Sequence, residues 1–318
     1  MFRAARGALA ALAMLACAAA AAAPAPPAAP MADPEATVVS ELVVQALERG
    51  PAWWRVSRGG STVYILGLPD GPTPPGVAWD TSVLERRLTG ANALLAGPGF
   101  RAGLTDIPGV FRLRAQLRSK APIAETLPPA LAARFAQASA RVGKRADRFD
   151  GWQPMAAGAF LFREAHDRWT PVEPQVVRLA RRHGVKVERP APYAAMPLAA
   201  TAIGSMTPQV QQDCLGWALD DVEAGEARAR RAAEGWARGD VAQALTAPRA
   251  FDRCLLALAG GAALWARVSQ DDADQIAAAL GRPGHAVAVV GLRRLLAENG
   301  VIARLEAQGL KVAGPGEP

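Results

Sequence analysis

The sequence contains few of the side chains, and none of the short motifs, that most often mark an active site. It has three histidines, three cysteines and two tyrosines among 318 residues. It lacks a G-x-S-x-G nucleophile elbow, a Walker A loop, a C-x-x-C pair and an H-E-x-x-H helix. These absences argue against an α/β-hydrolase with a serine nucleophile, a P-loop nucleotide enzyme, a thiol redox protein and an H-E-x-x-H metalloprotease.

The histidines are too few and too scattered to suggest a metal site. His166 and His183 close predicted helices, where an imidazolium interacts favourably with the helix dipole. His285 opens a predicted strand, so it lies roughly 20 Å from the far end of that strand at ~3.3 Å per residue. We expect surface or helix-capping roles for all three, and no bound cofactor.

Charge of one sign is not concentrated anywhere in the chain. The formal net charge is +7, and the basic residues, mostly arginine, are scattered among Asp and Glu. A nucleic-acid-binding protein would gather them on one face together with aromatic residues. We therefore expect no nucleic-acid partner and a solvated, arginine-rich surface.

The first 34 residues have the composition of an export signal and a linker. Residues 1–23 combine basic Arg3 and Arg6 with an alanine-rich apolar run and small residues at the end, which predicts a cleaved signal peptide. Residues 24–34 are a Pro/Ala linker, and residues 35–318 are predicted to form one domain. The protein is expected to be periplasmic or extracellular. Lipidation at Cys17 is the alternative, and it alone would place the protein at a membrane.

Without Cys17, two cysteines remain, Cys214 and Cys254. An even number in an exported protein predicts a disulfide bond, and the alternative is a pair of buried thiols.

Strand-like and helix-like segments alternate along the chain, which predicts an α/β fold. Apolar, β-branched runs predict strands at 53–57, 61–66, 91–96, 185–188, 285–290 and 310–313. Helical spacing of apolar residues predicts helices at 81–90, 127–142, 152–166, 172–183, 207–239, 252–265, 273–280, 292–296 and 301–308.

Two of these strands end in the same way. The strand STVYIL is followed by Gly67-Leu-Pro-Asp70, and HAVAVV is followed by Gly291-Leu-Arg-Arg294. A third strand, ANALLA, ends at Gly97. Because ligands bind outside the carboxyl ends of strands in such sheets, Asp70, Gly97 and Arg294 are the candidate site residues, and Gly67 and Gly291 the motif glycines.

Together with these strand ends, the segments GWQP (Gly151–Pro154), WARGD (Trp236–Asp240) and LLAENGVIARLEAQGLKV resemble the TraB/GumN family of the Tiki-like superfamily. The resemblance covers about residues 50 to 313. It implies a central mixed β-sheet flanked by helices. It also implies a divalent metal site, built from two G-x-x-H histidines and a strand-end glutamate, that supports peptide hydrolysis in one branch.

This chain departs from that pattern at every ligand position. Asp70 and Arg294 stand where the histidines are expected, and the glutamate position falls at Gly97, or at Ala96 if the register shifts by one. Arginine has no lone pair to donate to a metal and would repel one. We expect either an ion pair between Asp70 and Arg294 or two side chains that point independently to solvent.

The sequence therefore predicts an exported TraB/GumN-like protein that has lost the metal centre and binds a peptide, a polysaccharide or an envelope protein. The alternative is a hydrolase with a rearranged centre, in which Asp70 acts with another carboxylate. Glu164 and Glu188 could serve as acid or base, although surface or hydrogen-bonded structural roles are favoured for both.

Overall fold

A six-stranded mixed sheet organises the fold, with the strand order β5-β3-β7-β2-β1-β8. The computed structural model describes residues 50–317, so the predicted signal peptide, the Pro/Ala linker and Cys17 lie outside the described residues. The strands of this sheet are β1 (Trp53–Arg58), β2 (Ser61–Leu68), β3 (Leu94–Ala96), β5 (Val187–Glu188), β7 (Gly284–Gly291) and β8 (Val312–Ala313). The pattern confirms the predicted α/β class with a central mixed sheet.

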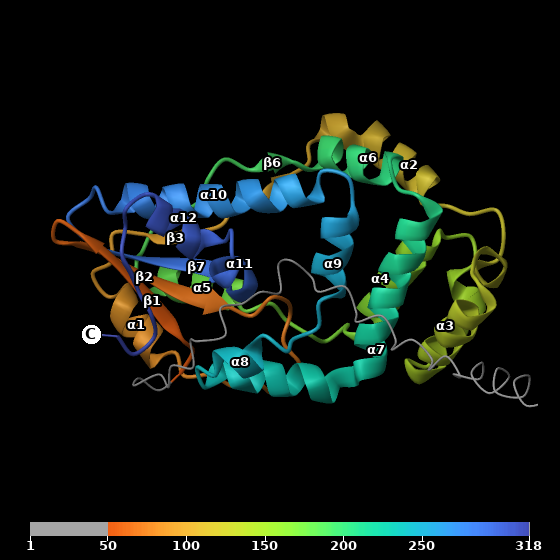
Figure 1. Ribbon diagram of the computed structural model, residues 1–318, viewed down its shortest axis with the longest axis horizontal. Coiled ribbons are helices and arrows are strands. Elements are labelled where there is room, and N and C mark those ends of the chain that lie inside the picture. Colours follow the sequence, from red (N-terminus) through yellow and green to blue (C-terminus); the bar gives the residue numbers. More distant parts are fainter. Residues whose placement is uncertain (1–49, 318) are drawn as a thin grey trace, which may run out of the picture. The chain divides into compact units, whose positions relative to one another are not determined.

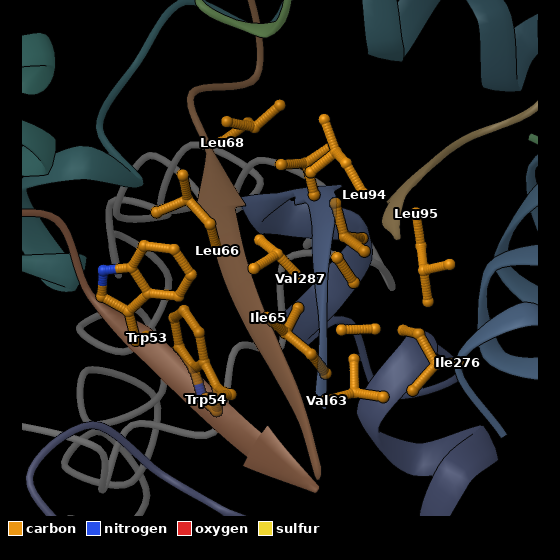
Figure 2. Close-up of a cluster of buried hydrophobic side chains, with 14 of the residues drawn as sticks. Trp53, Trp54, Val63, Ile65, Leu66, Leu68, Leu94, Leu95, Ile276 and Val287 are labelled. Atoms are coloured by element: carbon orange, nitrogen blue, oxygen red, sulfur yellow. The ribbon is translucent and has the colours of Figure 1, made fainter. Parts of the chain in front are cut away.

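The two central strands, β2 and β7, are parallel and carry apolar side chains on both faces. Their register pairs Gly67 with Val290 and Leu68 with Gly291, so the two glycine-terminated strand ends lie side by side. β3 runs parallel to β7 on its other side, and β1 is antiparallel to β2. Figure 2 shows side chains of β1, β2, β3 and β7 packed into one core.

Helices cover both sides of this sheet (Figure 1). The helices that pack near the strands are α1 (Ser82–Leu88), α5 (Glu173–Arg182), α10 (Gly261–Ala279), α11 (Leu292–Leu296) and α12 (Val301–Ala307). Each presents leucine, valine, isoleucine or alanine side chains to the strands, as amphipathic helical spacing predicts. In residues 50–317, no helix is long and apolar enough to span a bilayer.

A second hydrophobic core lies among helices away from the sheet. It joins α3 (Pro129–Arg141), α4 (Pro154–Ala165) and α7 (Pro208–Ala237), with side chains such as Phe135, Leu161 and Leu215. Two short helices follow α7, namely α8 (Val241–Ala244) and α9 (Ala250–Ala257). The sulfur atoms of Cys214 and Cys254 lie 2.02 Å apart and join α7 to α9, which confirms the predicted cysteine pairing.

Several elements differ from the sequence prediction. The predicted helix over 252–265 is wrong, because α9 ends at Ala257 and Gly260, with φ +78°, begins a turn into α10. Apolar spacing continues across this glycine and therefore predicts one helix. The left-handed backbone conformation of the glycine separates two. The elements α2 (Ile107–Gln116), α6 (Ala195–Gly204), β4 (Phe100–Arg101) and β6 (Tyr193–Ala194) were not predicted.

Candidate functional site

The carboxyl ends of β2, β3 and β7 open onto a cavity of about 470 Å³. Asp70, Gly97, Gly291 and Arg294 all line it, so the structure brings four of the five predicted site residues together. Ala96 is buried within β3, and Gly97 is the residue of that strand end that reaches the cavity. The rest of the wall is mainly apolar, with Leu68, Pro69, Pro98, Phe100, Phe251, Leu255, Leu264, Trp265 and Val268.

Gly67, the fifth of these residues, does not line the cavity and is packed within the end of β2. A Cβ atom there would lie 2.7 Å from Leu292 Cδ1 and 2.9 Å from Trp54 Cζ3, closer than carbon atoms approach. The Gly67 carbonyl accepts a hydrogen bond of 2.6 Å from the indole N–H of Trp236. Glycine is therefore required for packing, and the WARGD tryptophan fixes the end of β2.

Asp70 is held by the first turn of α11. Both of its carboxylate oxygens accept a hydrogen bond from the main-chain N–H of Arg293, at 3.0 and 3.2 Å. A Cβ at Gly291 would lie 3.2 Å from Asp70 Oδ1, so glycine there lets the carboxylate approach the backbone closely. A side chain at position 291 would crowd the Asp70 carboxylate, which explains why a glycine precedes this turn.

The Arg293 side chain also pairs with this carboxylate. Its Nε lies 3.4 Å from Asp70 Oδ2, and its guanidinium donates to the main-chain carbonyls of Leu245 and Ala247. The side chains of Asp70 and Arg293 are only 7% and 9% exposed. Burial raises the pKa of Asp70 to about 6, because the loss of hydration outweighs the attraction of the Arg293 cation.

Arg294, the next residue, points to a different partner. Its Nε and Nη2 donate to Oδ2 of Asp272 in α10, at 3.1 and 2.8 Å. A Cβ at Gly97 would lie 3.3 Å from Asp272 Oδ1 and 3.6 Å from Arg294 Nη2. This ion pair therefore occupies the space into which a longer side chain at position 97 would project.

The predicted ion pair between Asp70 and Arg294 is wrong in its partners. Asp70 pairs with Arg293, and Arg294 pairs with Asp272. Successive residues in a helix differ in direction by about 100°, so two adjacent arginines cannot reach the same carboxylate equally. The alternative, in which both side chains point independently to solvent, is also wrong.

A family model described as the TraB/PrgY/gumN family matches residues 52–313. The chain belongs to this family. No curated protein and no solved structure matches the chain significantly. Membership agrees with the mixed sheet and flanking helices, and the resemblance carried by the strand ends, GWQP and WARGD is confirmed.

The metal site implied by that resemblance does not fit the residues of this TraB/PrgY/gumN chain. Of the three ligand positions, one holds a carboxylate already paired with a cation, one holds glycine, and one holds an arginine. The part of the chain described here has no group of three or more His, Cys, Asp or Glu side chains placed to hold a metal ion. A cation at this position would face the Arg294 guanidinium, which repels it.

The histidines lie elsewhere in the TraB/PrgY/gumN fold. His166 is buried at the end of α4 between the rings of Phe162 and Trp169. Burial lowers the pKa of His166, so the neutral form is favoured there. His183 caps α5, and His285 forms a hydrogen bond with the main-chain carbonyl of Arg87 at 2.9 Å.

The two glutamates considered as acid or base have structural roles. Glu164 forms ion pairs with Lys144 and Arg148, and Glu188 pairs with Arg282. Hydrogen bonds from these cations lower the pKa of both carboxyls, which suits an ion-paired surface group better than an acid catalyst. Neither glutamate lines the cavity.

Asp252 and Glu173 are carboxylates of the cavity wall that no sequence motif marks, and Glu173 is paired with Arg189. The residue surface of Asp252 is 8% exposed, and within residues 50–317 its side chain has no hydrogen-bond or ion-pair partner. Burial, followed by the negative charge of Asp70, raises the pKa of Asp252 to about 7. The available sequence signal was only an aspartate in the first turn of a helix, which is commonly a dipole interaction.

Helix α9, which carries Asp252, is fixed in two ways. The Cys214–Cys254 bond ties it to α7, and the Asp221 carboxylate of α7 accepts a hydrogen bond of 2.7 Å from the main-chain N–H of Ala250 at its start. A rigid support is what a preorganised binding group requires.

Proposed function

We propose that this TraB/PrgY/gumN protein is exported and works by binding a ligand in the cavity, not by metal-dependent hydrolysis. The observation that carries the proposal is the Arg294–Asp272 ion pair, which fills the strand-end position where a metal ligand would stand. The ligand class is a peptide, a polysaccharide or a segment of an envelope protein.

The wall chemistry defines what such a ligand must present. Aromatic and aliphatic side chains would receive its apolar part, and the Asp252 carboxyl would receive a hydrogen-bonding amide or hydroxyl group. The other charged groups of the wall, Asp70, Arg294, Glu173 and Arg189, already have partners within the chain. Asp252 is therefore the polar group available to fix a ligand's orientation.

Elemental analysis of the purified protein tests the loss of metal chemistry. We expect Mn, Co and Zn to be present well below one equivalent per chain. A stoichiometric metal that disappears in an Asp70→Ala variant, and persists when exposed Asp167 is changed to Ala, would contradict the proposal.

Ligand binding has its own test. Thermal-shift screening against short peptides and oligosaccharides is expected to give binders whose affinity falls about tenfold in Asp252→Leu, the loss of one hydrogen bond to a buried carboxyl. Asp167→Leu serves as the matched control because that carboxyl is exposed and lies outside the cavity. Binders unaffected by Asp252→Leu would place the site elsewhere.

A second candidate function is hydrolysis by a carboxyl pair. The observation in its favour is that Asp70 and Asp252 line one cavity and both have raised pKa values, about 6 and about 7. Near neutral pH, one carboxyl could then donate a proton while the other accepts one. Peptide hydrolysis that continues in excess chelator, follows a bell-shaped pH profile and is lost in Asp252→Asn would favour this function.

Export rests on the N-terminal sequence and on the cysteine pair. Cell fractionation of the wild type is expected to place the protein outside the cytoplasm. A Cys17→Ala variant distinguishes a soluble exported protein, whose location does not change, from a lipoprotein, which would leave the membrane fraction.

A further inference from the structure

Large apolar side chains are exposed mainly in one short stretch of the chain. Of the six large apolar side chains that are exposed within residues 50–317, five lie between residues 100 and 111, and Leu104 and Phe111 are 86% and 68% exposed. The others in this stretch are Phe100, Ile107 and Val110. Exposed apolar residues scattered singly are normal, but a concentration like this one marks an interaction surface.

Helix α2 arranges three of these side chains on its outer face. Ile107, Val110 and Phe111 follow the i, i+3, i+4 spacing of one helical face, and Arg114 continues it at i+7. The helix packs on α6, as Figure 1 shows, through the face that contains Gly109, whose Cβ position lies 3.0 Å from Met196 Cε. Ile107, Val110 and Phe111 therefore point away from α6 and are exposed.

Basic residues are frequent in the sequence on both sides of this stripe. Residues 100–120 contain five basic side chains and one acidic one, and the acidic Asp106 accepts a hydrogen bond from the main-chain N–H of Gly103. The basic residues are Arg101, Arg112, Arg114, Arg118 and Lys120. Arg118 and Arg114 lie over the Trp152 ring, 4.3 and 5.8 Å from its centre, which keeps their charge at the end of the helix.

An apolar stripe with a basic border has the chemistry of a helix that lies in the plane of an anionic bilayer. Five basic side chains against one acidic one favour an anionic partner, and the headgroups of an anionic bilayer supply that charge beside an apolar phase. We infer that the segment Leu104–Lys120 docks on an anionic lipid surface, with Leu104, Ile107 and Phe111 entering the headgroup region. This inference does not depend on the cavity or on its ligand.

Vesicle co-sedimentation of the purified protein tests the inference. Vesicles of phosphatidylglycerol and phosphatidylcholine in equal parts are compared with vesicles of pure phosphatidylcholine, at low and high salt. We expect binding to the anionic vesicles that weakens at high salt, because screening reduces attraction to the surface. Equal binding to both vesicle types, or none to the anionic ones, overturns the inference.

Two double variants separate the contributions of apolar area and of charge to vesicle binding. Leu104→Ser with Phe111→Ser removes apolar area, and Arg112→Gln with Lys120→Gln removes charge; each is expected to weaken binding roughly tenfold or more. Arg141→Gln and Arg182→Gln are the matched controls, because both side chains are exposed and lie outside this segment and outside the cavity.

The controls and the variants share one N-terminal sequence, so any contribution of that sequence to vesicle binding cancels in the comparison. Loss of binding in the controls as well as in the segment variants overturns the inference. Analytical ultracentrifugation tests whether a second copy of the chain covers the segment instead. A wild-type dimer that dissociates in the double variant Leu104→Ser with Phe111→Ser would assign the segment to that contact and overturn lipid docking.

Discussion

Asp70 accepts the main-chain N–H of Arg293 through both carboxylate oxygens while the guanidinium of the same residue lies 3.4 Å away. One residue thus supplies both the hydrogen-bond donor and the counter-ion. The carboxylate is committed to the start of α11, at the position where the family resemblance implies a histidine facing the cavity. Asp70 stabilises the strand end, and the polar group left for a ligand is Asp252.

Replacing Arg293 by methionine is expected to lower the free energy of unfolding by about 3 kcal/mol at pH 8, because it leaves a buried carboxylate without its cation. Removal of the cation also raises the pKa of Asp70 above its present value of about 6. A raised carboxyl pKa means that stability falls as pH rises through it, so the loss should be smaller at pH 5. Urea denaturation at the two pH values measures both effects.

The double variant Asp70→Asn with Arg293→Met provides the control for this pair. Compared with the single variant Asp70→Asn, it lacks only the Arg293 cation and has no carboxyl at position 70, so the loss caused by Arg293→Met should be the same at pH 5 and pH 8. A residual loss should remain, because the carbonyls of Leu245 and Ala247 still lack the donors that Arg293 supplies. An Arg293→Met loss that is the same at both pH values would contradict the ion-pair account.

Asp252→Asn is expected to stabilise the protein at alkaline pH. The pKa of Asp252 is raised from 3.8 to about 7, mainly by burial, so the wild type loses stability as pH rises between these two values. Asparagine has the same shape and cannot ionise. The free energy of unfolding of the variant should therefore exceed that of the wild type by an amount that grows from about pH 4 to about pH 7, reaching on the order of 4 kcal/mol.

Chemical denaturation across this range checks the prediction, and Asp167→Asn is the control because the Asp167 side chain is 71% exposed. The slope with pH should be unchanged in the control. If the difference between Asp252→Asn and the wild type stayed constant with pH, the carboxyl would not titrate in this window.

The central sheet could be predicted because each of its main strands is marked by a continuous segment of the sequence. The apolar runs of β2 and β7 and the glycines that end them are visible in the sequence, and strand register then brings the two ends together. The cysteine pairing was also predictable, since only two cysteines remain outside the predicted signal peptide.

The carboxylates that helices α9 and α10 bring to the site could not be predicted in the same way. Asp272 and Asp252 come from α10 and α9, and their position depends on a left-handed turn at Gly260 that separates the two helices. Which of two adjacent arginines faces Asp70 depends on the direction of the first turn of α11. The spacing at the strand ends predicts which residues lie at the cavity. The direction of each side chain depends on packing, which the spacing does not show.

Replacement of Cys214 and Cys254 by alanine is expected to cost about 3–4 kcal/mol of unfolding free energy, because the bond closes a loop of about 40 residues in the unfolded chain. Reductant should reproduce the loss in the wild type and have no effect on the double variant. Thermal denaturation with and without reductant measures this. Because α9 carries Asp252, ligand binding should weaken along with stability.

Gly67→Ala tests the packing that holds the end of β2. The added methyl group would lie 2.7 Å from Leu292 Cδ1 and 2.9 Å from Trp54 Cζ3, so the strand end must shift. Overpacking of this kind costs about 1–3 kcal/mol. Gly71→Ala is the matched control, four residues further along, where a Cβ would meet no atom within 4 Å. Denaturant midpoints of the two variants give the comparison, and equal stability would mean that β2 tolerates a side chain at its end.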